Sequence, residues 1–163
     1  TVQLPDGRET DLEVVRHPGG AAIVAVDEAN RVCLIKQFRH AAGGWIWELA
    51  AGVRDHAEPP EQTARRELKE ETGLSASDWQ PLGSLLSTPG FCDERLFLYL
   101  AQDLTQGEHA REENEFIEVH WMAMDQAVQM ALSGEIEDAK TVIGLFRAQA
   151  FFEAQAVSKA QAV

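Results

Sequence analysis

Residues 52–74 read GVRDHAEPPEQTARRELKEETGL, and this stretch holds the most specific local signals in the chain. Pro59 and Pro60 are typical of a helix start, because proline is tolerated in the first turn of a helix. Gly73 is typical of the position that follows a helix. The sequence therefore predicts a helix at about residues 60–72.

The last turns of this helix are crowded with acidic side chains, which oppose the helix dipole and repel one another. Glu67, Glu70 and Glu71 occupy one arc of the helix surface, beside Ala64 and Leu68, which should point into the core. Three carboxylates at the edge of a buried face form an oxygen-rich pocket suited to Mg²⁺ or Mn²⁺. The alternative is a solvated face stabilised by salt bridges.

The bulk composition is that of one ordinary globular domain. The chain has 163 residues, 45% hydrophobic and 25% charged, with a net charge of −13. This charge argues against nucleic acid as a partner, and no apolar run is long enough to predict a membrane partner. Cys33, expected in the core, and Cys92 make no disulfide framework, and no secretory signal is visible at the start. We therefore expect a cytoplasmic protein.

Short apolar runs alternate irregularly with helical patterns, which predicts an α/β or α+β sandwich. A turn at residues 4–7 predicts a hairpin at the start. A helix is expected at 125–134, capped by Asp125 and ended by Gly134, and a longer one at 138–156. Strands are expected at 21–26, 31–38, 45–52, 82–88, 95–102 and 116–122.

The spacing of the acidic helix is more specific than its charge. The constrained residues, in register over 23 positions, are Gly52, Glu58, Arg66, Glu67, Leu68, Glu70, Glu71, Gly73 and Leu74. This pattern resembles the signature of the Nudix hydrolase family. The resemblance implies an α/β/α sandwich with a mixed central sheet over residues 21–163, after a short hairpin segment at 1–20. It also implies metal-assisted hydrolysis of a nucleoside diphosphate linked to another group.

The resemblance also implies a set of metal ligands. Glu67 and Glu71 would be the main ligands, with Glu70 close by and the backbone carbonyl of Ala51 as a further ligand. The ion would be Mg²⁺, with Mn²⁺ as a possible substitute. Glu70 and Arg66 count among the catalytic residues, although Arg66 should point away from the acidic arc and pair with an acid such as Glu58.

Features outside the signature resemble the ADP-ribose pyrophosphatase branch of that family. They are Pro89 in STPGFCDERLFLYLA, Arg39 in LIKQFRHAAGGWIWELAAG, and the acidic stretch in REENEFIEVHWM. The resemblance implies that Arg39 and Pro89 bind substrate and that Glu94 lies near the metals or the terminal ribose. In the acidic stretch, Glu113 would be the general base, with Glu115 as the second choice.

Simpler interpretations stand beside these roles. Pro89 could only shape a turn, Arg39 could form a surface salt bridge, and Glu113 could be solvated. Ala50 stands where the branch usually has proline, and the N-terminal segment is short for the homodimer that the branch commonly forms. The predicted reaction converts ADP-ribose or a related ADP-sugar to AMP and a sugar phosphate. The alternatives are another nucleotide sugar such as GDP-mannose, or a catalytically silent nucleotide-binding regulatory domain.

Overall fold

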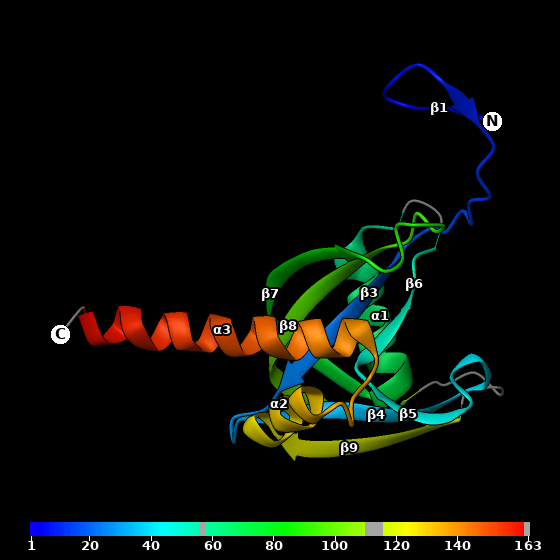
Figure 1. The fold of residues 1–163 in the computed structure, drawn as a ribbon. Coiled ribbons are helices and arrows are strands. Elements are labelled where there is room, and N and C mark those ends of the chain that lie inside the picture. The colour runs from blue at the N-terminus through cyan, green and yellow to red at the C-terminus, as the bar shows by residue number, and fades with distance from the viewer. Residues whose placement is uncertain (56–57, 110–115, 162–163) are drawn as a thin grey trace.

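A seven-stranded mixed sheet organises the chain (Figure 1). The structure, a computed structural model, describes residues 1–55, 58–109 and 116–161. Its strands follow the order β5-β4-β3-β8-β7, while β6 pairs with β3 and β9 pairs with β4. The strands are β3 (Gly20–Val26), β4 (Arg31–Arg39), β5 (Gly44–Glu48), β6 (Ala50–Val53), β7 (Leu74–Leu86), β8 (Arg95–Gln106) and β9 (Ile117–Ala123).

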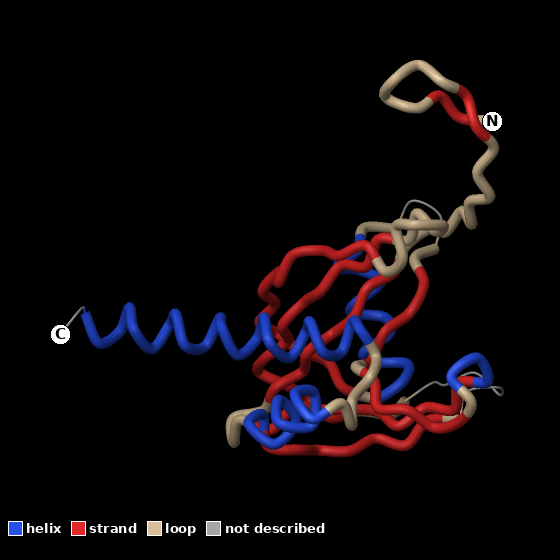
Figure 2. Tube along the Cα trace, in the orientation of Figure 1, coloured by secondary structure: helices blue, strands red, loops and turns tan. Residues whose placement is uncertain are grey.

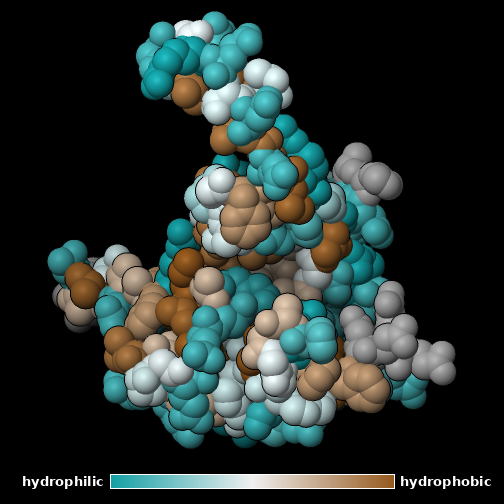
Figure 3. Space-filling view, turned by 45° about the vertical axis from the view of Figure 1, so that its right-hand side comes forward, coloured by the Kyte–Doolittle hydropathy of each residue, from teal (hydrophilic) through white to brown (hydrophobic). Residues whose placement is uncertain are grey.

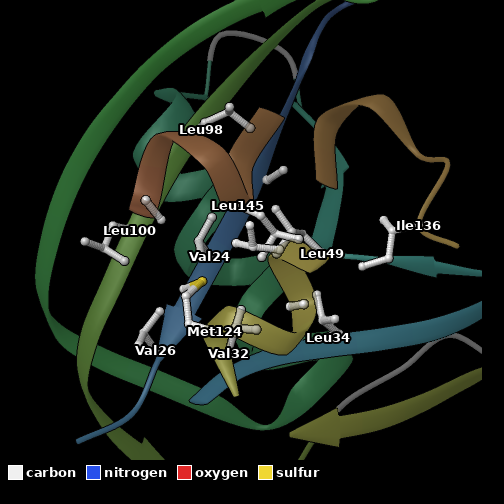
Figure 4. Packing of buried hydrophobic residues seen from close by; sticks show 14 of the residues in the cluster. Val24, Val26, Val32, Leu34, Leu49, Leu98, Leu100, Met124, Ile136 and Leu145 are labelled. Carbon is white, nitrogen blue, oxygen red and sulfur yellow. The ribbon is translucent and has the colours of Figure 1, made fainter. Parts of the chain in front are cut away.

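The central strand β3 is buried along its whole length, because both faces of the sheet are covered by helices. Ala21 and Ile23 pack in one cluster with Ala64 and Leu68 of α1 (Pro60–Thr72). Val24 belongs to the cluster on the opposite face (Figure 4). That cluster also takes residues from α2 (Met124–Ser133) and α3 (Ala139–Gln161). The predicted α/β/α sandwich with a mixed central sheet is thereby confirmed.

Helix α1 has the bounds that the sequence predicts. Pro60 is its first residue, and Gly73 follows it in the left-handed conformation with φ of 76°. The Gly73 N–H donates to the carbonyl of Lys69 at 2.9 Å, which satisfies one of the last carbonyls of the helix. The chain then enters β7 at Leu74 without a loop. This abrupt exit places the acidic end of the helix next to the sheet.

Three of the predicted elements differ in the structure, in their pairing, their cap or their start. Residues 45–52 form two strands instead of one, because β5 pairs with β4 whereas β6 pairs with β3. Asp125 lies in the first turn of α2 and does not cap it; the N-cap position is held by Ala123. Strand β7 also begins eight residues before the predicted strand at 82–88, and the register shift between Pro81 and Gly83 explains why its two halves do not read as one strand.

The N-terminal hairpin is the least embedded part of the fold. Among the described strands, β1 (Val2–Gln3) and β2 (Glu9–Thr10) pair only with each other, and they project from the sandwich (Figures 1 and 2). Apolar residues are exposed along the segment that leads back to the sandwich (Figure 3), namely Leu12, Val14 and Val15, with Phe91 close to Val15. In the described part of the chain, no helix has both the length and the apolar character needed to cross a membrane.

Candidate active site

Two glutamates of α1 are buried, although their side chains are polar and ionisable. Glu67 and Glu71 face the sheet next to the buried Ala64 and Leu68, as the helical spacing predicts, while Glu70 lies nearer to solvent. Burying a carboxylate is costly unless other groups compensate it. The position of these two side chains therefore calls for compensating groups close by.

Strand β6 provides part of that compensation through its backbone. The Ala51 N–H donates to Oε2 of Glu71 at 2.9 Å. Because the N–H and C=O of one strand residue point to the same side, the Ala51 carbonyl also faces α1. At Gly52 the approach is closer still: a Cβ there would come within 3.0 Å of all three atoms of the Glu67 carboxylate group. The glycine is required because the carboxylate occupies the space that a side chain would fill.

Arg66 compensates the remaining charge. Its Nη1 donates to Glu67 Oε1 at 2.6 Å and to Glu70 Oε2 at 3.0 Å, and its Nη2 lies 3.3 Å from Glu58 Oε2. The predicted pairing with Glu58 is confirmed, but the expectation that Arg66 points away from the acidic arc is wrong. The reason is that residues four apart on a helix are neighbours, which brings Glu70 within reach. Burial alone would lower the pKa of Arg66, but its acidic partners outweigh burial and raise it.

These groups line a cavity of about 360 Å³, the acidic cavity, which also borders Gln37, Arg39, Val53 and Asp55. Its oxygen ligands have the chemistry that Mg²⁺ and Mn²⁺ prefer, so the donor set fits such an ion. Among the described residues, however, no three acidic, histidine or cysteine side chains already converge on one point. Glu67 is turned toward Arg66, and Glu71 toward the Ala51 N–H.

Arg39 lines this cavity, and hydrogen bonds to a buried carboxylate fix its position. Its Nε and Nη2 donate to the two carboxylate oxygens of Glu48 at 2.7 and 3.0 Å. Glu48 is only 1% exposed while Arg39 is 42% exposed, so this bidentate pair is buried at its carboxylate end and is not a surface salt bridge. The hydrogen bonds to Glu48 outweigh the effect of burial and raise the pKa of Arg39.

A second cavity of about 310 Å³, the neutral cavity, adjoins the first. Both are lined by Arg39, Ala51, Gly52 and Val53, and the second also borders Glu94. Glu94 Oε1 lies 3.3 Å from Nδ1 of His17. Glu94 therefore lines the second cavity and does not line the acidic cavity.

Pro89 lies apart from both cavities. It borders a surface hollow with Leu12 and Phe91, and the Phe91 N–H donates to the carbonyl of Thr88 at 3.2 Å. This geometry is that of a turn with Pro89 at its second position. The two candidate bases, Glu113 and Glu115, lie outside the described residues.

The comparison with known proteins gives the family. Residues 16–144 match the family model described as the NUDIX domain. This chain belongs to the Nudix family. The chain is 38% identical to an ADP-ribose pyrophosphatase of Bacillus subtilis over 146 residues, which covers 88% of this chain and 79% of the relative. It is 40% identical to an ADP-ribose pyrophosphatase of Mycobacterium tuberculosis over 152 residues, which covers 91% and 73%.

The fold of this Nudix domain also matches a solved structure. The crystal structure of an ADP compounds hydrolase aligns with a TM-score of 0.80 at 22% sequence identity, covering 94% of this chain and 83% of that one. At this identity the likeness shows the fold.

Two residues of the Nudix site were missed by sequence reasoning. Glu48 is one, and the signal that could have found it is an acidic residue inside the apolar run WIWELAAG. Gln37 is the other: it is 5% exposed and lines the acidic cavity, and its Oε1 accepts no hydrogen bond from the described residues. A polar residue on the buried face of β4 is the corresponding signal for Gln37.

Proposed function

We propose that this Nudix hydrolase cleaves the diphosphate of ADP-ribose or a related ADP-sugar and releases AMP and a sugar phosphate. The observation that carries the proposal is the pair of buried carboxylates, Glu67 and Glu71, held against the backbone of β6. A helix shaped for stability alone would not bury two acids near its C-terminal end. The names of the relatives support the choice of substrate.

The site residues would hold Mg²⁺, with Mn²⁺ as a possible substitute. Glu67, Glu71 and the carbonyl of Ala51 would be ligands, with Glu70 close by. When bound, such an ion neutralises the diphosphate and makes water a better nucleophile. Arg66 would hold the carboxylates of Glu67 and Glu70 in place, which matches its hydrogen bonds to both.

The chain's own residues would also bind the substrate and move the proton. Arg39 would contact the diphosphate, because its Nη1 makes no hydrogen bond within the described residues and it borders both cavities. Glu94 would lie on the terminal ribose side. Glu113 would take the proton of the attacking water, with Glu115 as the second choice.

We also propose a homodimer in the cytoplasm. The projecting β1–β2 hairpin and the exposed Leu12, Val14 and Val15 offer apolar surface that a second copy could cover. The free thiols of Cys33 and Cys92 agree with a reducing compartment.

The test replaces single acids of α1 and measures hydrolysis of ADP-ribose with Mg²⁺. Glu67→Gln and Glu71→Gln should lose most activity while they remain folded, because each change removes a ligand charge. The matched control is Glu61→Gln on the same helix, an exposed acid paired with Arg65, which should keep its activity. Wild-type turnover in the Glu67 or Glu71 variant would remove that residue from the proposed site.

A further inference from the structure

The neutral cavity has two cations at its wall and a buried anion behind them. Glu48 accepts hydrogen bonds from both Arg39 and Lys140. The Glu48 side chain is 1% exposed, whereas those of Arg39 and Lys140 are 42% and 13% exposed. The negative end of this group is therefore sealed inside the protein, while the positive ends border the cavity.

Lys140 is held in place from two sides. Besides its bond to Glu48, its Nζ lies 3.0 Å from Oδ1 of Asp138. Oδ2 of Asp138 accepts from the Thr141 N–H at 3.0 Å, so the same aspartate also caps the start of α3. An ammonium group has three donors, and these two acceptors use two of them. Within the described residues the third donor has no acceptor, so it remains for a molecule in the cavity.

Glu48 keeps its charge in this buried position. Burial alone would raise its pKa, but the hydrogen bonds from Arg39 and the positive charge of Lys140 outweigh burial and lower it. An ionised carboxylate fixes the direction of both cations, because each must keep its bond to Glu48. The geometry is thus preorganised before any substrate enters.

The composition of the neutral cavity suits the sugar half of the substrate. It shares Arg39 and the backbone of Ala51–Val53 with the acidic cavity, so a molecule anchored at the acidic helix can extend into it. Its other polar side chains include Ser87, Glu94 and Asp138, which can accept hydrogen bonds from sugar hydroxyl groups. Its volume of about 310 Å³ is at the lower end of the range of small-molecule sites.

We propose that Lys140 is a further substrate-binding residue, whose ammonium group and Arg39 together bind the phosphate oxygens of the sugar-phosphate half. Glu48 is the positioning residue, whose hydrogen bonds keep the side chains of Arg39 and Lys140 next to the neutral cavity. This inference rests on the proposed function for the identity of the sugar phosphate. The chain has a net charge of −13, which repels a phosphate group. Two cations that face the neutral cavity would offset this repulsion there.

The experiment measures which half of the substrate depends on Lys140. Ribose 5-phosphate and AMP are each titrated by calorimetry into the wild type and into Lys140→Met, in the presence of Mg²⁺. A lost charge-assisted bond should weaken binding of ribose 5-phosphate roughly 10- to 100-fold and leave that of AMP unchanged. For ADP-ribose hydrolysis, KM should rise and kcat should change little, because the contact is made equally in the ground and transition states.

The control separates this role from a structural one. Thr141→Val removes the hydrogen bond that Thr141 Oγ1 accepts from the Leu49 N–H and the one it donates to Asp138 Oδ2, whereas the bonds from Arg39 and Lys140 to Glu48 remain. It should lower Tm and leave the ratio of the two affinities unchanged. If Lys140→Met does not fold, Lys140→Gln, which keeps donors for Glu48, takes its place.

The outcomes are distinguishable. Unchanged binding of ribose 5-phosphate in the folded Lys140 variant overturns the inference, and so does weaker binding of AMP alone, which would place the nucleoside half in this cavity. If the wild type binds ribose 5-phosphate in a Lys140-dependent manner but does not hydrolyse ADP-ribose, the proposed function fails while the phosphate contact stands.

Discussion

Replacing Gly52 with alanine should disable the acidic cavity without unfolding the protein. The added Cβ would come closer than 3.0 Å to Cδ, Oε1 and Oε2 of Glu67, and ordinary contact begins only at 3.4 Å. The Glu67 carboxylate would have to move by on the order of 1 Å, whereas metal ligands tolerate errors of only about 0.2 Å. Gly52 lies in β6 and has no positive φ, so alanine brings no backbone strain.

The size of the effect follows from that displacement. A misplacement of about 1 Å at a reacting centre costs about 100-fold in rate. At 1.36 kcal/mol for each factor of ten, this corresponds to about 2.7 kcal/mol of activation free energy. The loss should act through Glu67 alone. The double variant Gly52→Ala, Glu67→Gln should therefore be no slower than Glu67→Gln by itself.

The assay compares kcat for ADP-ribose, Mn²⁺ affinity by electron paramagnetic resonance, and Tm. Gly44→Ala is the matched control, because a Cβ at Gly44 meets no atom within 4 Å. If Gly52→Ala keeps both kcat and Mn²⁺ affinity within about threefold of the wild type, the Glu67 carboxylate is not displaced as expected, since a factor of three is under about 1 kcal/mol.

Three further predictions concern buried polar groups. Gln37→Met should raise the metal-free free energy of unfolding by about 1–3 kcal/mol, because it removes a buried side-chain carbonyl oxygen that accepts no hydrogen bond from the described residues; a lower value in urea titrations would contradict this. Glu48 has a folded-state pKa below the ordinary 4.5, so the stability it contributes is present above pH 4.5 and lost as the pH falls below it. As the pH falls below 4.5, the free energy of unfolding should therefore decrease less for Glu48→Gln than for the wild type. Parallel plots of unfolding free energy against pH for the two proteins would contradict this. Burial, followed by the charge of Glu71, raises the pKa of the Cys33 thiol to about 12, so iodoacetamide should modify the partly exposed Cys92 first, and equal rates by mass spectrometry would contradict it.

The sequence predicted those parts of the fold that depend on local signals. Proline at the start and glycine at the end gave the bounds of α1, and the 3.6-residue period placed Ala64 and Leu68 in the core and the acids at its edge. The resemblance to the family signature then predicted the sandwich architecture. These signals are local because each depends on a backbone conformation or on a face of one helix.

Long-range pairing could not be predicted in the same way. Residues 45–52 read as one apolar strand, and only the presence of both β4 and β3 as partners divides them into two. The Glu48 network was missed for the same reason, since Arg39, Glu48 and Lys140 come from three elements that meet only in the folded chain. The direction of the Arg66 side chain was predicted wrongly because several acids lie within its reach. Sequence spacing does not say which of them it contacts.

We infer that the buried acids of α1 serve hydrolysis of ADP-ribose. The most direct measurement incubates the purified protein and Mg²⁺ with ADP-ribose, ADP-glucose and GDP-mannose, and identifies the products by chromatography. We expect AMP and ribose 5-phosphate from ADP-ribose, formed faster than any product of the other two. Faster cleavage of GDP-mannose would contradict the substrate. Nucleotide binding with no cleavage of any of the three would contradict the enzymatic function and favour a regulatory domain.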